Sequence, residues 1–117
     1  MIQAKVLEIG KDALTSDDGL VILFGKKASL RLREVSLIQE INVVKDDYEI
    51  TAGQKLTIDD QVYTIEYVGN LVKENLKTVE HTVLDFNKIP ENPRNNALYL
   101  TPNVMPKVIV GSQITIG

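Results

Sequence analysis

The chain has 117 residues, 44% hydrophobic and 25% charged, a composition that excludes general disorder and predicts one domain spanning residues 1–117. It has no cysteine and one histidine, which excludes disulfides, thiol nucleophiles and histidine-rich metal sites, and no cofactor is expected. The net charge of −3 gives no overall attraction to nucleic acid, and no apolar run reaches the roughly 20 residues of a membrane-spanning helix.

The first half of the chain reads mainly as strands, because Val, Ile and Thr far outnumber Ala and favour pleated structure. Residues 2–9 nearly alternate, with one slip, as at a bulge or in a strand buried on both faces. Residues 16–19 contain a turn signal, and residues 20–24 form a short apolar run typical of a buried strand. Residues 28–34 fit no pattern, and residues 35–44 predict another strand.

The second half begins with a predicted hairpin, in which residues 55–58 and 61–68 are joined through Asp59 and Asp60. Residues 70–79 are the only stretch with helix-like spacing, and they are long enough for one or two turns. Residues 80–86 return to strand, residues 87–96 form the longest loop, and the last short strands are predicted at residues 97–101, 107–110 and 112–116. The expected fold is all-β, a small closed or partly open barrel of short strands with at most one short helix.

Two segments share the pattern Gly-x-x-apolar-Thr-Ile, one beginning at Gly53 and the other at Gly111. The plain explanation is that many strands begin with glycine and then alternate. The sharper explanation is a barrel built from two related halves. The shared pattern predicts two equivalent strands, in which Ile58 and Ile116 face the interior and the threonine before each isoleucine faces outward.

Few side chains apart from the histidine suggest chemistry. The Asp-Asp pairs at residues 17–18, 46–47 and 59–60 could act as calcium ligands or acid–base pairs. Each pair lies in a predicted turn, however, where aspartate is favoured because it hydrogen-bonds to its own backbone. Residues 25–33 carry four basic side chains but no aromatic one, so a solvated edge strand is favoured over a nucleic-acid site.

His81 is the one side chain that titrates near neutral pH without perturbation and can form a phosphohistidine. As an isolated feature, a single histidine on a strand is more often structural than catalytic. If residues 80–86 form a strand, His81 shares a face with Val79, Val83 and Asp85, and Glu80 points the other way. His81 is therefore a candidate catalytic residue provided that a donor can reach one of its ring nitrogens.

Residues 68–86 carry Val68-Gly69, Asn75-Leu76, His81 and Phe86, and the C-terminal part carries Pro102, Pro106 and Gly111-Ser112-Gln113-Ile114. In these motifs and in its length, the chain resembles the glucitol/sorbitol-specific enzyme IIA family of the bacterial phosphotransferase system. The resemblance implies a small β-barrel in the cytoplasm. It also implies that a histidine accepts a phosphoryl group from the phosphocarrier HPr and that the group then passes to sugar-permease subunits.

The resemblance also places the usual phosphorylated histidine, within an apolar-Ile-His-x-His stretch that precedes the central hairpin. The counterpart in this chain has Gln39 at the first histidine and Ile41 at the second. Glu80 stands where the family has a glycine before the later histidine. Because the amide nitrogen of glutamine is not nucleophilic, an active member would have to use His81.

Several functions remain open at this point. One is a working enzyme IIA, with His81 as the acceptor and with HPr and permease subunits as partners. Another is a catalytically silent homologue that acts as a protein-binding or regulatory module, which Gln39 and Ile41 favour. A third is an unrelated carbohydrate- or peptide-binding barrel. The sequence is also compatible with a homo-oligomer.

Overall fold

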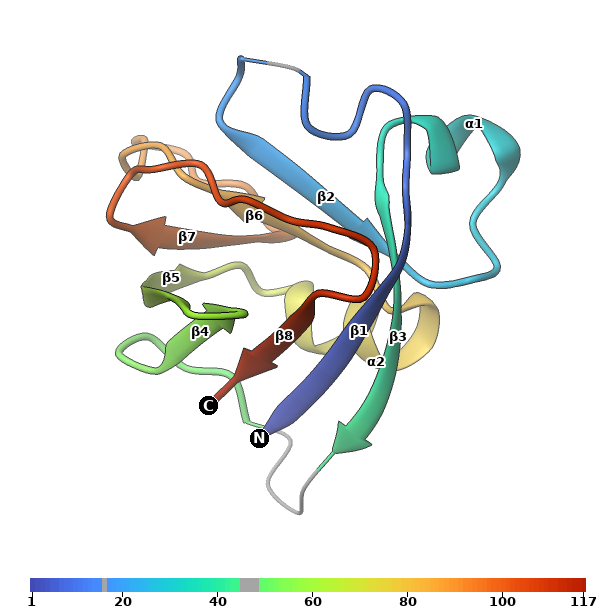
Figure 1. Cartoon of the computed structure of the whole chain (residues 1–117). Helices are drawn as coiled ribbons and strands as arrows, with labels where there is room; N and C mark the ends of the chain where they lie inside the picture. The colour runs from blue at the N-terminus through green and yellow to red at the C-terminus, as the bar shows by residue number, and fades with distance from the viewer. Residues whose placement is uncertain (16, 45–48) are drawn as a thin grey trace.

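The computed structural model describes residues 1–15, 17–44 and 49–117. Within these ranges, eight strands close into one mixed barrel in the order β1-β3-β2-β6-β7-β5-β4-β8, which confirms the predicted β-barrel (Figure 1). The same ranges hold two short helices. The elements in chain order are β1 (Ile2–Ile9), β2 (Leu20–Phe24), α1 (Leu30–Glu34), β3 (Leu37–Val44), β4 (Lys55–Ile58), β5 (Gln61–Val68), α2 (Val72–Val79), β6 (Thr82–Asp85), β7 (Ala97–Thr101) and β8 (Gln113–Ile116).

Most predicted strands are found where the alternation of apolar side chains placed them. β1 is irregular between Val6 and Glu8, which confirms the predicted bulge. The hairpin of β4 and β5 turns at Asp59, whose φ of 55° is a left-handed conformation that aspartate tolerates in tight turns. The predicted helix is the eight-residue α2, which buries Val72 and Leu76 one turn apart.

A second helix, α1, lies in the range that fitted no sequence pattern, so the expectation of at most one short helix is wrong. Its five residues are too few to show a periodic apolar signal, and its N-terminus is capped by Ser29, whose Oγ accepts from the N–H of Leu32 at 3.3 Å. The predicted edge strand over residues 25–33 is therefore wrong. The basic residues of that segment lie in a loop and in α1 instead.

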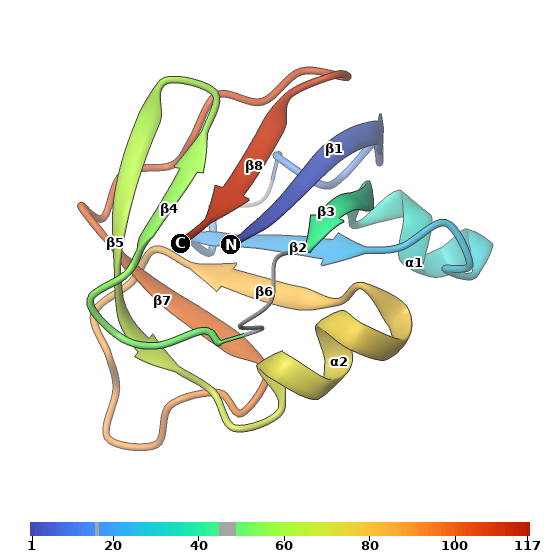
Figure 2. The ribbon, with the colours of Figure 1, turned by 90° about the horizontal axis from the view of Figure 1, so that it is seen from below.

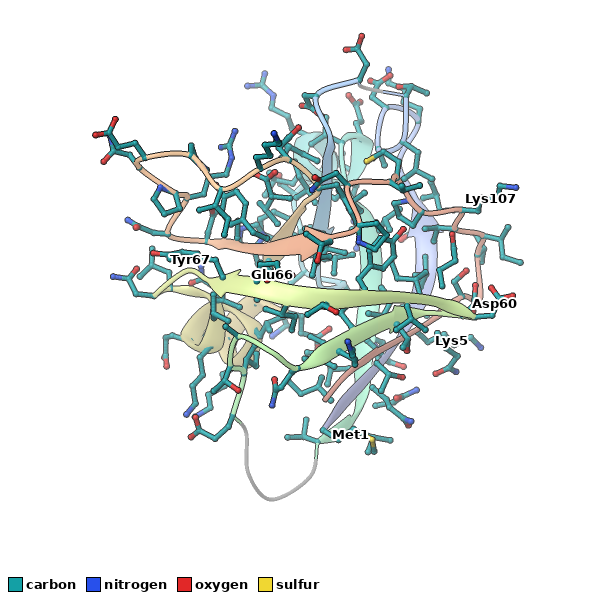
Figure 3. The ribbon with its side chains drawn as sticks, turned by 90° about the vertical axis from the view of Figure 1, so that its left-hand side faces the viewer. Met1, Lys5, Asp60, Glu66, Tyr67 and Lys107 are labelled. Carbon is teal, nitrogen blue, oxygen red and sulfur yellow. The ribbon has the colours of Figure 1, made fainter. Side chains whose placement is uncertain are left out.

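The strand predicted at residues 107–110 is also absent. The N–H of Lys107 donates to Oε1 of Gln61 at 2.7 Å, and the N–H of Ile109 donates to Oγ of Ser112 at 2.9 Å. Side chains therefore satisfy backbone donors that a neighbouring strand would otherwise have to satisfy. Figure 3 shows Lys107 and Asp60 on the same side of the barrel, where β5 begins and where a hydrogen bond from Gln61 to the carbonyl of Lys107 anchors this loop.

The hydrophobic core fills the interior of the barrel. Among the described residues, aromatic contact in this interior is limited to Tyr63 and Phe86, whose rings meet edge to face with their centroids 5.1 Å apart. Neither helix of the described ranges is long and apolar enough to span a membrane. Fully buried aliphatic side chains come from both halves of the chain and include Val6, Val21, Leu23, Leu37, Leu56, Ile58, Ile65, Leu84, Leu98 and Leu100.

The two Gly-x-x-apolar-Thr-Ile segments form neighbouring antiparallel strands. Thr57 of β4 lies opposite Thr115 of β8, so the pair has a local two-fold relationship. Ile58 and Ile116 are buried, whereas both threonines are partly exposed. The predicted facing of these four side chains is confirmed.

This equivalence extends around the whole barrel. The strands β1, β2, β3 and β4 correspond to β5, β6, β7 and β8, in that order. If each strand is exchanged with its counterpart, the order of strands around the barrel stays the same but runs in the opposite direction. The N–H of Gly53 donates to the carbonyl of Ile65 at 2.7 Å, and the N–H of Gly111 donates to that of Val6 at 2.8 Å. Both glycines have positive φ, at 98° and 95°. The barrel thus consists of two equivalent units, named here the N-terminal half (residues 1–58) and the C-terminal half (residues 59–117).

Candidate functional site

His81 lies in the turn between α2 and β6. The helix ends at Glu80, whose φ of 54° is left-handed, and the N–H of His81 donates to the carbonyl of Asn75 at 3.2 Å. His81 is 9% exposed, whereas Val79 is half exposed. The predicted shared strand face of His81 and Val79 is therefore wrong, because a left-handed residue separates helical Val79 from His81 and the strand begins at Thr82.

The imidazole ring of His81 has a partner at each nitrogen. Nδ1 lies 2.9 Å from the carbonyl oxygen of Leu23, which can only accept, so Nδ1 carries the proton in the neutral ring. Nε2 keeps its lone pair and lies 3.2 Å from the side-chain amide nitrogen of Asn96, which donates. Phe24 stacks on the ring, with centroids 4.0 Å apart. The nucleophilic nitrogen, Nε2, therefore faces a side chain and not the backbone.

Gln39 lies beside this turn, although it belongs to β3, which is separated from β6 by β2 in the barrel. It is buried, and its Nε2 donates to the carbonyl oxygen of Glu80 at 2.9 Å. The carboxylate of Glu80 in turn accepts from the N–H of Ile41 at 3.4 Å. The two positions at which the resemblance places histidines thus meet the turn that carries the one histidine of the chain. Gln39, Ile41, Glu80 and His81 together form the candidate site.

An ion pair borders the candidate site on its outer side. Lys26 pairs with Glu40, the strand neighbour of Gln39. A hydrogen bond from Lys26, together with its charge, lowers the pKa of the Glu40 carboxyl, and the same bond raises the pKa of the Lys26 ammonium. Both side chains are exposed, so water and salt screen the pair and it contributes little to stability.

The inner side of the candidate site is closed by the barrel core. Gln39 and Ile41 border a cavity of about 10 Å³, which is lined mainly by aliphatic side chains. This space is too small for a cofactor. Among the described residues, no group of three His, Asp or Glu side chains could hold a metal ion. The chemistry available to the site is therefore that of the His81 ring.

The acidic pairs in the described ranges lie in turns. Asp18 accepts from the N–H of Leu20 at 3.1 Å, and Asp59 accepts from the N–H of Gln113 at 2.9 Å and from Oγ of Ser112 at 2.7 Å. These two bonds lower the pKa of the Asp59 carboxyl. The turn interpretation is confirmed for Asp18, which caps its own turn. Asp59 lies in the predicted hairpin turn, but its carboxylate binds a distant segment and not its own backbone, so the expected reason for it is wrong. The third pair, at residues 46–47, lies outside the described residues.

Asn96 was not identified from the sequence, although it supplies the partner of Nε2 in His81. It ends the long loop before β7, and its carbonyl accepts from the N–H of Val83 at 2.9 Å. Parallel pairing of β6 with β7 brings it beside the histidine. No local pattern marks this asparagine among the several in the same loop.

Known proteins of one kind are similar to this chain over nearly its full length. The family model described as PTS system glucitol/sorbitol-specific IIA component matches residues 1–115. Among solved structures, the PTS system IIA component from Enterococcus faecalis V583 is 35% identical, with a TM-score of 0.85 and with 97% of each chain covered. No curated protein sequence gives a significant match.

Proposed function

Because the chain belongs to the glucitol/sorbitol-specific IIA component family of the phosphotransferase system, we propose that His81 is its phosphoryl acceptor. Members of this family relay a phosphoryl group and interact with phosphocarrier and permease components. In our proposal the donor is the phosphocarrier HPr and the recipients are sugar-permease subunits. The chain acts in the cytoplasm as a single domain.

The observation that carries this proposal is the hydrogen bond from Nδ1 of His81 to the carbonyl of Leu23. It keeps the proton on Nδ1 and the lone pair on Nε2. During transfer, Nε2 attacks the phosphorus of the phosphorylated donor, whose N–P bond breaks as a new N–P bond forms at Nε2. The Leu23 carbonyl stabilises the positive charge that develops on the ring.

Asn96 has to release Nε2 before this step, because its amide now donates to the same lone pair. Rotation of the side chain frees the nitrogen. The amide N–H can then donate to an oxygen of the incoming phosphoryl group, which is a stronger acceptor. Asn96 would therefore protect the nucleophile before transfer and stabilise negative charge during it.

Incubation with phosphoenolpyruvate, enzyme I and HPr tests the proposal. We expect an acid-labile, alkali-stable label on the chain, as for a phosphoramidate, and we expect His81→Gln to abolish it. Lys88→Gln, a change of a lysine outside the candidate site, serves as the control and should label normally. A wild-type chain that stays unlabelled, where another IIA component of this family is labelled, would contradict the proposal.

A second function is favoured by Gln39 and by the low exposure of His81. In this alternative the chain is a catalytically silent member that binds its partners as a protein-binding or regulatory module. Gln39→His places an imidazole at the position of the usual acceptor. A label on Gln39→His but not on the wild type, with HPr binding retained by both, would support the silent member and exclude the relay through His81.

A further inference from the structure

Helix α1 exposes apolar side chains although it covers no part of the core. None of its five residues is buried, and Leu30 is 84% exposed. Leu32 and Val35, on the same short segment, are also exposed. Clustered exposed apolar side chains on an otherwise ordinary surface mark places where another molecule binds.

Polar contacts hold α1 in place, and none of its residues is fully buried. The guanidinium of Arg33 donates to the carbonyl of Ala28 at 3.1 Å and to that of Lys26, and it pairs with Glu8 of β1. Ser29 caps the first turn. The leucines are thus presented by a fixed segment, so a partner would lose little ordering entropy when it binds them.

Two exposed cations lie close to Leu30 in the chain. Lys27 and Arg31 flank Leu30 in sequence, and both are exposed. Among the described residues, neither of them has an ion-pair partner, whereas nearby Lys26 is paired with Glu40. An apolar surface between unpaired cations is complementary to an apolar pocket rimmed by carboxylates.

The C-terminal half supplies an internal control for the role of α1. Leu23 pairs with Leu37 across the parallel strands β2 and β3, as Leu84 pairs with Leu98 across β6 and β7, so the two connections have equal length. In the second connection, Glu91 stands at the place of Leu30, and Pro93 at that of Leu32. The barrel therefore closes this connection without exposed leucines, and the fold does not require them in α1.

The position of α1 places it beside the candidate site. A surface depression of about 220 Å³ is lined by residues 25–27, which lead into α1, and by residues 78–80, which end α2 and precede His81. Figure 2 shows both helices on the side of the barrel away from β4 and β5. A protein that docks on α1 would therefore lie beside the turn that carries His81.

We propose that the α1 surface, formed by Leu30, Leu32, Lys27 and Arg31, docks a partner protein that presents an apolar pocket rimmed by carboxylates. The inference rests on the proposed function in one respect, namely that this partner is one of the two kinds of protein between which the phosphoryl group moves. A second copy of this chain fits less well. The basic α1 surface would have to meet an acidic region elsewhere on the copy, and such a head-to-tail contact does not close by two-fold symmetry.

Binding of purified HPr and of purified permease subunits to the full chain tests the proposal. In the Leu30→Ser, Leu32→Ser double variant, we expect the Kd for one of these partners to rise at least tenfold. Because Leu30 is 84% exposed and no residue of α1 is fully buried, the variant should keep the wild-type circular dichroism and stay close to the wild-type unfolding midpoint. Ile89→Ser, which removes an exposed apolar side chain from the equivalent connection of the C-terminal half, is the matched control and should leave every Kd unchanged.

Arg31→Gln provides a second measurement that does not depend on the leucines. We expect it to weaken the same interaction and to reduce its salt dependence, because one screened charge pair is lost. Unchanged Kd values for all partners in both variants would overturn the proposal. So would a wild-type chain that binds none of them, or an effect of the double variant confined to self-association or to anionic phosphatidylglycerol vesicles.

The outcome can be separated from that for the phosphoryl acceptor. If the α1 variants weaken partner binding but the wild-type chain is not phosphorylated, the docking proposal is supported and the phosphoryl relay through His81 is rejected. If the chain is labelled but the α1 variants leave its Kd values for the partners unchanged, the docking proposal is rejected and the proposed phosphoryl acceptor is not affected.

Discussion

In the N-terminal half, the parallel strands β2 and β3 set Leu23 opposite Leu37, and in the C-terminal half β6 and β7 set Leu84 opposite Leu98. All four side chains are buried in the same core. The shared pairs show that the two halves use one framework, in which apolar residues at matching positions meet inside the barrel. A framework position can therefore be checked against its counterpart in the other half.

The candidate site breaks this equivalence. Gln39 of β3 lies opposite Val6, and its counterpart Leu100 of β7 lies opposite Ile65, so a buried amide in one half corresponds to an aliphatic side chain in the other. The leucine fills the core, whereas the glutamine reaches the turn at Glu80. The polar cluster around His81 is therefore not needed to build the barrel, because the other half builds it without one.

The strongest effect is expected at the isoleucines that end the two equivalent strands. Ile58→Ala and Ile116→Ala should each lower the free energy of unfolding by about 2–5 kcal/mol, because each removes buried methyl groups from a packed interior. Urea denaturation measures both. Val62→Ala, at an exposed position of β5, should change the free energy of unfolding by less than about 0.5 kcal/mol. A large loss at one isoleucine and none at the other would show that the halves are not equivalent.

A smaller effect is expected at Gly53 and Gly111. Both have φ close to 95°, and a Cβ at either position would meet nothing within 4 Å, so substitution tests the backbone conformation alone. Gly53→Ala and Gly111→Ala should each cost roughly 1–2 kcal/mol, since L-residues are strained there. Thermal and urea unfolding should give the same ranking for the two variants. If one of them is as stable as the wild type, the two turns do not share a conformation.

Ser36 and Ala97 offer an exchange between the halves. Ser36 precedes β3 and Ala97 begins β7, and the two places match because Gly10 and Gly69 donate to their respective carbonyls at 2.9 Å. The buried hydroxyl of Ser36 has no hydrogen-bond partner among the described residues. Ser36→Ala should therefore raise the free energy of unfolding by about 1 kcal/mol, and Ala97→Ser should lower it by about 1–3 kcal/mol. A destabilised Ser36→Ala variant would reveal a partner for the hydroxyl.

The weakest effect concerns pH and Asp59, which follows Ile58 as Gly117, a residue without a side chain, follows Ile116. Hydrogen bonds from Gln113 and Ser112 lower the pKa of Asp59 in the folded chain. The unfolded state therefore binds the proton more readily, so this stabilisation is present above the ordinary aspartate pKa of about 3.9 and is lost as the pH falls through the folded value. Asp59→Asn should show a shallower acid loss of stability in urea titrations, because asparagine tolerates the positive φ but does not titrate. Parallel acid curves would contradict this.

Several features followed from the sequence because their causes are local. Alternation of apolar and polar residues located the strands, and Asp59 and Asp60 located the central hairpin. The Gly-x-x-apolar-Thr-Ile pattern predicted the facing of Ile58 and Ile116, because the side-chain period of a strand is two. His81 was the candidate acceptor on sequence grounds, because the chain has no other histidine.

Two segments, residues 25–33 and residues 107–110, were wrongly predicted to be strands, and the structure gives a physical reason for each. α1 spans five residues and buries none, so no apolar period could reveal it. Residues 107–110 have the composition of a strand, yet Gln61 and Ser112 take up backbone groups there with their side chains. Composition predicts a preference for extended backbone, and it does not reveal whether a strand is available to pair with it.

The strand content, the central hairpin and the identity of the candidate acceptor could all be obtained from the order of residues. Tertiary structure was needed to establish that Gln39 reaches the carbonyl of Glu80, that Asn96 donates to His81, and that α1 stands beside this turn. These contacts join residues far apart in the chain. They depend on which strands pair and in which register. The alternation of apolar and polar residues in a strand determines which of its faces points inward, but it does not determine which strand pairs with it.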